Sequence, residues 1–145
     1  MKSFVISLQR CPGYRKPMEK IISAEVIENF GIRGDMHALP DSSRQLLLIE
    51  KETLDTLGLQ PGIVKENITT EGIVLMKLPP KQRLKIGEAV ILEITKPCSP
   101  CSRMEEIHPG LLKEIAGRRG MLARVVKCWF VHIGDSVELI PTSSQ

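Results

Sequence analysis

Aromatic side chains are scarce in this sequence of 145 residues, since Phe, Trp and Tyr together make up 3% of it. A hydrophobic content of 42% still provides enough apolar side chains for a core, which must consist mostly of Ile, Leu and Val. β-Branched residues favour strands. The composition therefore predicts a strand-rich fold. The length predicts one domain over residues 1–145, because domains commonly hold roughly 100 to 150 residues.

Long hydrophobic runs are also missing. No segment reaches the roughly 20 apolar residues that a transmembrane helix needs. The start, MKSFVISLQRCPG, has an apolar run too short for a signal peptide, and no cleavage site of small residues follows it. We therefore expect a cytoplasmic protein with no membrane partner, whose four cysteines stay reduced. Such cysteines indicate chemistry, metal binding or burial before a disulfide framework.

A strong charge of one sign is absent as well. The net charge of +3 is mild, whereas binding to duplex nucleic acid usually needs a dense basic patch that contacts many phosphates. The tight basic clusters are Arg118-Arg119 and Arg15-Lys16, which we interpret as solvated surface because short charge runs usually are. The charge predicts an anionic small molecule as the ligand and no nucleic acid.

Short apolar segments and turn signals alternate along the chain. Residues 4–9 alternate as a strand would, residues 44–49 form a short buried run, and residues 51–59 have helical spacing that ends at a glycine. Two similar segments, 86–90 and 133–137, each place a glycine and an acid before a predicted strand. Many short strands with few helices predict a β-barrel or a β-sandwich with helical insertions.

Cys98 and Cys101 form a C-x-x-C pair within KPCSPCSRME. A structural zinc site needs four ligands, usually from two such pairs, but Cys11 and Cys128 stand alone and the three histidines are scattered. A thioredoxin-type redox motif needs a βαβ context, which the sequence does not provide. The pattern therefore disfavours both structural zinc and a redox disulfide.

A single activated thiol is the next interpretation of this pair. The pair follows a predicted strand and precedes a segment with helical character, where free backbone N–H groups stabilise a thiolate. Lys96 and Arg103 add positive charge nearby. A thiolate binds soft metals and accepts sulfur. Spacing alone does not separate this interpretation from two small buried residues in a turn.

Polar side chains elsewhere are candidates for a binding site. Asp35 and His37 lie two residues apart and share a face in an extended chain. The aspartate would orient the imidazole, or both would bind a polar ligand; a surface turn is the alternative. Glu66, Asn67 and Thr69 bring polar side chains and turn amides into one stretch, which can receive a phosphate or the edge of a heterocycle.

Arg44 and Arg124 lie within or beside apolar strand runs. An arginine in such a place either anchors an anion or extends its charged tip to solvent at the edge of a sheet. Trp129, the one tryptophan, is compatible with a core position, a lid or an association surface, and we expect a partly exposed contact residue.

Taken together, several segments resemble the MOSC domain, named after the C-terminal domain of molybdenum cofactor sulfurases. They follow the order of the family and span most of the chain, and the ENITTEG stretch followed at a distance by PCSPC is the most specific part. The segments are GIRGDMH (31–37), RQLLLIE (44–50), LQPGIVKENITTEGI (59–73), LKIGEAVILEITKPCSPC (84–101), GRRGMLARVV (117–126) and IGDSVEL (133–139).

The resemblance implies a mainly β fold with a few short helices: a closed β-barrel like the barrel domain of pyruvate kinase, in the small single-domain branch of the family. It also implies that the protein binds the molybdenum cofactor (molybdopterin) or transfers sulfur through a cysteine persulfide. In reductase members a cysteine near the matching position ligates the metal, and the enzyme reduces N-hydroxylated bases. By position, Cys101 is that cysteine, with Cys98 as its neighbour.

The resemblance further implies one cavity around Cys101. A phosphorylated pterin needs arginine and backbone N–H donors for its anionic tail, and a thiolate suits its soft metal. The expected catalytic residues are Cys101, His37 and Asp35, and the expected cofactor-binding residues are Arg44, Glu66, Asn67, Thr69 and Arg124.

Three functions are compatible with these residues. The first is a molybdenum-dependent oxo-transfer reductase; larger reductases of the family carry further modules, so here electrons would come from an electron-donor protein. The second is a sulfur carrier that loads Cys101 from a cysteine desulfurase and passes sulfur to a metal–sulfur centre or cofactor. The third is a non-enzymatic module that binds the cofactor or a partner. The sequence does not indicate the oligomeric state.

Overall fold

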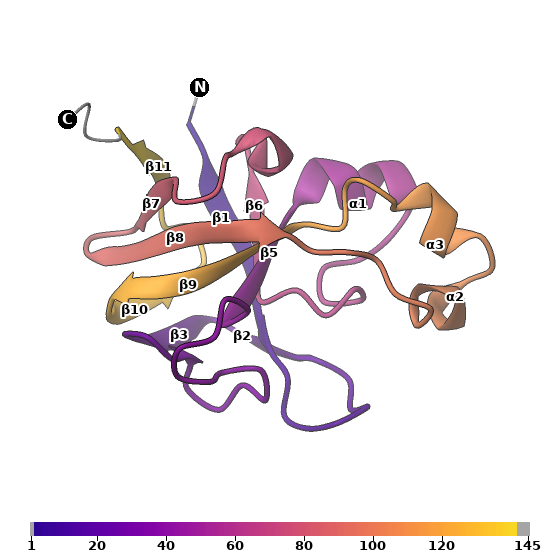
Figure 1. Cartoon of the computed structure of the whole chain (residues 1–145), viewed down its shortest axis with the longest axis horizontal. Coiled ribbons are helices and arrows are strands. Elements are labelled where there is room, and N and C mark those ends of the chain that lie inside the picture. Colours follow the sequence, from indigo (N-terminus) through magenta and orange to yellow (C-terminus); the bar gives the residue numbers. More distant parts are fainter. Residues whose placement is uncertain (1, 142–145) are drawn as a thin grey trace.

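The computed structural model describes residues 2–141, and its elements are mostly short strands (Figure 1). The strands are β1 (Phe4–Arg10), β2 (Glu19–Ile21), β3 (Ser23–Ile27), β4 (Gly31–Ile32), β5 (Leu46–Glu50), β6 (Ile68–Glu71), β7 (Arg83–Ile86), β8 (Val90–Pro97), β9 (Met121–Lys127), β10 (Trp129–His132) and β11 (Val137–Ile140). The helices are α1 (Lys51–Leu57), α2 (Met104–Ile107), α3 (Leu111–Glu114) and the 3-10 helix η1 (Leu75–Lys77). The prediction of a mainly β fold with few short helices is confirmed.

The strands form two sheets. Eight of them are ordered β11-β7-β8-β9-β5-β6-β1-β2, and β10-β3-β4 form a smaller sheet. Only β5 and β6 pair in parallel among these strands. A parallel pair needs a crossover connection, and α1 with the loop after it provides that connection. The helix predicted over residues 51–59 is α1, which ends at Gly58 with φ of 69°.

The prediction of a closed barrel is not supported. Within residues 2–141 the large sheet ends at β11 on one side and at β2 on the other, and no ladder joins these two strands. β1 pairs with β6 along one edge and with β2 through Leu8–Arg10, so only its first residues can meet the β11 side. There the contact is an isolated bridge between Phe4 and Ser136 with three backbone hydrogen bonds. The Val5 N–H donates to the Asp135 carbonyl (2.8 Å), the Gly134 N–H to the Val5 carbonyl (2.7 Å) and the Val137 N–H to the Ser3 carbonyl (2.9 Å).

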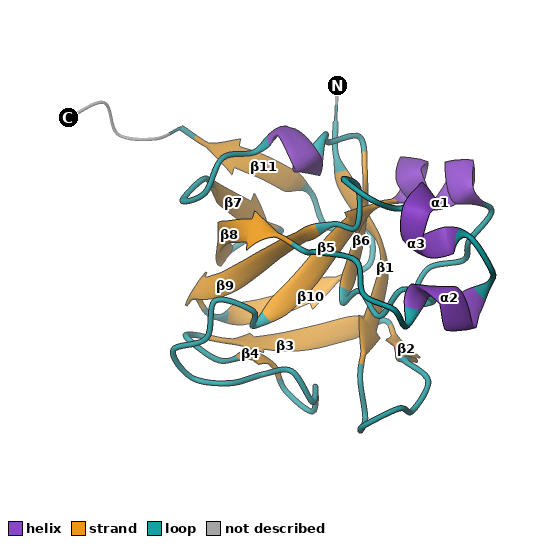
Figure 2. Cartoon of the chain, turned by 45° about the vertical axis from the view of Figure 1, so that its right-hand side comes forward, coloured by secondary structure: helices purple, strands orange, loops and turns teal. Residues whose placement is uncertain are grey.

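The core is aliphatic, as the scarcity of aromatics predicts. Strand β8 shows how it forms, because its alternating residues Val90, Leu92 and Ile94 are buried on one face. A second cluster joins Ile49 of β5 to α1, α2 and α3 through Leu54, Met104 and Leu111. Figure 2 shows the three α-helices gathered at one end of the large sheet. This second cluster therefore fixes the helical end of the molecule.

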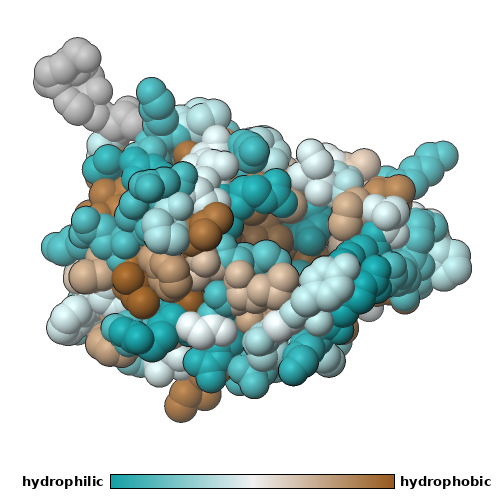
Figure 3. Space-filling model, turned by 60° about the horizontal axis from the view of Figure 1, so that its bottom comes forward, coloured by the Kyte–Doolittle hydropathy of each residue, from teal (hydrophilic) through white to brown (hydrophobic). Residues whose placement is uncertain are grey.

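The surface is mostly hydrophilic, with separate apolar spots on the face drawn in Figure 3. Trp129 is 52% exposed and packs edge-to-face against Phe130, with ring centroids 5.7 Å apart. The exposed fraction of Trp129 therefore agrees with the expectation of a partly exposed residue. No helix in the described part of the chain has the length and apolar character needed to cross a membrane.

Candidate functional site

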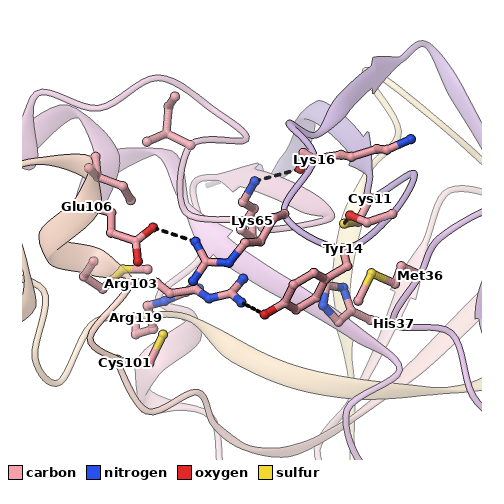
Figure 4. A pocket seen from close by; sticks show the side chains of 15 residues that line it. Cys11, Tyr14, Lys16, Met36, His37, Lys65, Cys101, Arg103, Glu106 and Arg119 are labelled. Carbon is pink, nitrogen blue, oxygen red and sulfur yellow. Dashed lines mark hydrogen bonds and ion pairs between the residues drawn. The ribbon is translucent and has the colours of Figure 1, made fainter.

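A cavity of about 550 Å³ lies beside α2, between the loop that follows β1 and the segment that follows β8 (Figure 4). Its volume is in the range of roughly 300 to 1,000 Å³ that small-molecule sites occupy. A smaller hollow of about 90 Å³ adjoins it, because His37, Lys65 and Arg119 line both. Loops 11–18 and 98–103, far apart in sequence, therefore help to form one binding region.

The structure separates the two cysteines of the C-x-x-C pair. Cys101 is exposed and lines the large cavity, and its carbonyl accepts the Met104 N–H at 2.9 Å. Cys98 is buried against Leu47 and Leu122 and lines only the small hollow. Its N–H donates to the Gly120 carbonyl at 2.9 Å, which ties the end of β8 to the start of β9. Cys98 thus occupies a packing position, and Cys101 is the member of the pair that faces the large cavity.

The basic residues flanking this pair differ in their placement. Arg103 lines the large cavity, where its Nη2 donates to the Tyr14 hydroxyl at 3.0 Å. Lys96 is exposed and lines neither hollow. Helix α2 has only four residues, so a macrodipole contributes little here. The positive charge near Cys101 therefore comes from side chains.

Asp35 and His37 have different roles in the loop between β4 and β5. Asp35 is buried, and its carboxylate accepts the Cys11 N–H (2.7 Å), an Asn67 side-chain N–H (3.1 Å) and the His37 backbone N–H (3.2 Å). His37 lines both hollows, with its Nδ1 4.0 Å from Asp35 Oδ2. The structure therefore brings His37 to the cavity, while Asp35 holds the surrounding loops together beneath it.

The polar stretch before and within β6 is buried. Asn67 lines the small hollow, where its Oδ1 accepts the Leu47 N–H at 3.0 Å. Glu66 lies deeper, and its Oε2 accepts the Gly62 N–H (2.7 Å) and the Thr69 hydroxyl (2.9 Å). Burial raises the pKa of Glu66. Glu66 and Thr69 line neither hollow. They stabilise the backbone next to the site instead of facing a ligand.

Arg44 and Arg124, the two arginines expected to bind the cofactor, lie in different surroundings. Arg44 is exposed and lines the small hollow. Arg124 lines neither hollow and instead contacts Glu93 Oε2, with its Nη2 at 3.1 Å. The two residues are opposite one another in the β8–β9 ladder, where opposite charges attract. Alternation along β9, which buries Ala123 and Val125, directs Arg124 to the other face.

Arg119 is the site residue that the sequence interpretation missed. It is 6% exposed and lines both hollows, so its interpretation as solvated surface is wrong. Arg118 is half-buried, and its guanidinium donates to the Glu114 carbonyl. The sequence feature that could have indicated the burial of Arg119 is the glycine that follows it. Gly120 has φ of 109°, and a Cβ there would be 2.4 Å from the Leu48 carbonyl oxygen. This close approach to β5 places Arg119 inside.

Positive charge dominates the large cavity. Its lining holds one acid, Glu106, which pairs with Arg15 at 3.2 Å. Arg15 and Arg103 lower the pKa of Tyr14 between them. Such an excess of cations in a concave site attracts anionic ligands. The Lys and Arg residues of the lining are Arg15, Lys16, Lys65, Arg103 and Arg119.

Residues 2–141 contain no group of three or more His, Cys, Asp or Glu side chains placed to hold a metal ion. Cys101, Cys11, His37 and Glu106 all line the cavity, but no three of them are placed to hold one ion, so a metal bound at Cys101 would need further ligands from elsewhere.

Solved structures that share this fold at low sequence identity include a YuaD protein and two YiiM proteins. The YuaD protein from Bacillus subtilis has a TM-score of 0.84 at 17% identity, covering 99% of this chain and 98% of its own. YiiM from Geobacillus stearothermophilus has a TM-score of 0.76 at 16% identity, with 96% and 75% coverage. YiiM from Escherichia coli has a TM-score of 0.72 at 17% identity, with 100% and 72% coverage.

Sequence comparison gives the family directly. No curated protein matches the chain significantly. The model of the MOSC domain matches residues 33–138, which is more than half of the chain and includes His37, Cys101 and Arg119. The chain therefore belongs to the MOSC domain family, which is associated with molybdenum cofactor binding.

Proposed function

We propose that this protein binds the molybdenum cofactor in the large cavity, with the Cys101 thiolate as a ligand of the metal. The observation that carries this proposal is the meeting of an exposed thiol and a buried guanidinium in one cation-lined cavity. A soft metal favours thiolate ligands, and an anionic pterin phosphate favours arginine and lysine. The donors present therefore fit the cofactor.

Each polar residue has a definite part in this proposal. Arg44 and Asn67, in the small hollow, would hold the polar parts of the pterin, and Lys65 and Arg119 would neutralise its charge. His37 would hold or move a proton at the cavity wall, where its ring lies 4.0 Å from the Asp35 carboxylate. When bound, the cofactor supplies the two-electron chemistry of oxo transfer. The proposed reaction is the reduction of an N-hydroxylated small molecule, with electrons from a donor protein.

The metal content of purified protein tests this function. Protein made in a host that synthesises the cofactor should contain stoichiometric molybdenum, and Cys101→Ser should lose most of it because a hydroxyl is a poor ligand for a soft metal. Cys98→Ser is the matched control and should keep its molybdenum, since Cys98 packs outside the large cavity. Folded, reduced wild-type protein without molybdenum would contradict the proposal. Binding that survives Cys101→Ser would instead favour a non-enzymatic cofactor-binding module.

A sulfur carrier is the second candidate, and the exposure of Cys101 beside Arg103 and Arg119 favours it. A thiolate accessible from solvent can accept sulfane sulfur from a cysteine desulfurase. Incubation with a desulfurase and free cysteine should add one sulfur atom, measured by intact mass. Cys101→Ser should abolish the addition, whereas Cys128→Ser, which removes the other exposed thiol, should not. Equal loading of the Cys101→Ser variant would contradict this role.

A further inference from the structure

Cys11 is a second thiol of the large cavity, and the proposed function does not use it. It directly follows β1 and lines the cavity, although it is buried. Its Sγ donates a hydrogen bond to the Gly13 carbonyl at 3.2 Å. A thiol is a weak donor, so little is lost when this sulfur takes a different partner. Cys11 is therefore a potential thiolate ligand that reaches the cavity from a different segment than Cys101.

Met36 and His37 lie beside Cys11. The Met36 N–H donates to the Cys11 carbonyl at 2.8 Å, and Met36 is 45% exposed although its side chain is apolar. Met36 and His37 belong to one turn, and both line the cavity. Figure 4 shows Cys11, Met36 and His37 on one side of the cavity, with Tyr14 between them and Cys101. A thiol, a thioether and an imidazole therefore lie close together.

Asp35 joins the two segments that carry these side chains. Its Oδ1 accepts the Cys11 N–H at 2.7 Å, and its Oδ2 accepts the His37 backbone N–H at 3.2 Å. The His37 ring is near the same carboxylate, with Nδ1 4.0 Å from Oδ2. A carboxylate beside one ring nitrogen orients an imidazole and leaves the other nitrogen to bind a metal ion. Asp35 therefore occupies the position of a carboxylate that supports a metal-binding histidine.

The donor types and the charge of the cavity select the metal. Thiolate and thioether sulfurs favour Cu(I), and imidazole also binds copper. The thiolate of Cys11 would neutralise a monovalent ion. A divalent ion would leave a net positive charge beside the basic side chains that line the cavity, which is unfavourable. Since no three His, Cys, Asp or Glu side chains within residues 2–141 are placed to hold a metal ion, the Met36 thioether is the ligand that completes the set.

We propose that Cys11, Met36 and His37 bind one Cu(I) ion on the side of the large cavity opposite Cys101. The ligand atoms are Cys11 Sγ, Met36 Sδ and His37 Nε2, and the Cys11 thiol releases its proton to solvent when the ion binds. The site uses neither Cys101 nor Arg119 as a ligand. It therefore goes beyond the proposed function and does not depend on it.

Competition with a chromogenic chelator tests the site, with Cu(I) itself as the probe under reducing, anaerobic conditions. Wild-type protein free of molybdenum should remove one equivalent of copper from the Cu(I)–bicinchoninate complex, and Zn²⁺ in excess should not displace it. X-ray absorption at the copper edge should show sulfur and nitrogen ligands together. Failure to take one equivalent from the chelator, or displacement of the copper by Zn²⁺, would overturn the proposal.

Variants of the exposed ligands assign the site without perturbing the buried thiol. Met36→Leu removes only the sulfur and should weaken Cu(I) binding by at least about tenfold, since even residues that merely support a metal ligand contribute roughly 10–100-fold. His37→Gln should have a similar effect, and Cys11→Ser should weaken binding as well. Cys101→Ser and Cys128→Ser remove the two exposed thiols and should bind copper as wild type does.

Cys101→Ser separates this site from the proposed function, because the variant should lose molybdenum and keep copper. Loss of copper in Cys101→Ser would place the ion at Cys101 and refute the assignment. Wild-type affinity in both Met36→Leu and His37→Gln would refute it equally, because the ion would then be bound by other residues.

Discussion

Glu66 is a carboxyl group that the fold buries completely while giving only one of its oxygens a partner. Oε2 accepts two hydrogen bonds, and Oε1 has none in the described part of the chain. Burial disfavours the charged form and raises the pKa of Glu66, although the hydrogen bonds and Arg119 act in the opposite direction. The folded protein therefore holds this proton more tightly than the unfolded chain does.

A definite pH dependence of stability follows from this difference. The stabilisation by the Glu66 proton is fully present below the ordinary glutamate pKa and is lost as the pH rises through the raised folded pKa. Glu66→Gln should remove this loss, because an amide oxygen can still accept from Gly62 and Thr69 and carries no titrating proton. The variant should gain on wild type by about 1.4 kcal/mol per pH unit inside that window.

Urea unfolding of both proteins from about pH 4 to about pH 8 measures this difference. Glu105 provides a control of opposite sign, because the N–H groups of Gly110 and Leu112 lower the pKa of Glu105. Its stabilisation is present above the ordinary pKa and is lost as the pH falls, so Glu105→Gln should approach wild type in acid. A difference between Glu66→Gln and wild type that does not change with pH would show that Glu66 is ionised in the fold.

Single strands and helices were the parts that sequence patterns predicted well. The alternation over residues 4–9 became β1, and the helical spacing over 51–59 became α1 with a left-handed Gly58 at its end. The similar segments at 86–90 and 133–137 lie together, since the Gly87 N–H donates to the Ser136 carbonyl at 2.8 Å. The strand and the helix depend on local spacing and backbone preference, which neighbouring residues determine, whereas the contact between the two similar segments is a long-range one.

The composition of the site was harder to predict because it depends on register and on close approach between distant strands. Arg124 faces away because β9 pairs with β8 in a register that sets it opposite Glu93. Arg119 faces inward because Gly120 passes within contact distance of the Leu48 carbonyl on β5. Neither pairing can be read from the residues around an arginine. His37 and Cys101 both line the cavity, and their catalytic roles stay predictions.

The cavity reaches the second aliphatic cluster through Met104 of α2, but its mouth is formed by exposed groups. Two aliphatic clusters contain the fully buried aliphatic side chains and carry much of the stability of the molecule. Across the cavity, the loop after β1 contacts the segment after β8 through exposed groups: the Arg103 guanidinium lies 5.0 Å from the Tyr14 ring centroid, and Arg15 pairs with Glu106. The core is thus firmly packed, whereas the two segments that form the mouth of the cavity are joined by exposed contacts.

Breaking the mouth contacts should therefore change access to Cys101 much more than it changes stability. Exposed ion pairs and hydrogen bonds of this kind contribute roughly 0–1 kcal/mol each. The double variant Tyr14→Phe with Glu106→Gln removes the hydroxyl partner of Arg103 and the carboxylate partner of Arg15. We expect its unfolding free energy to stay within about 1 kcal/mol of wild type, while Cys101 alkylation accelerates severalfold and Cys128 is unaffected.

Lys51→Gln, which breaks the exposed Lys51–Asp55 pair on α1, is the matched control and should change neither rate. If Cys101 reacted equally fast in all three proteins, the contacts between Tyr14, Arg103, Arg15 and Glu106 would not restrict entry to the cavity.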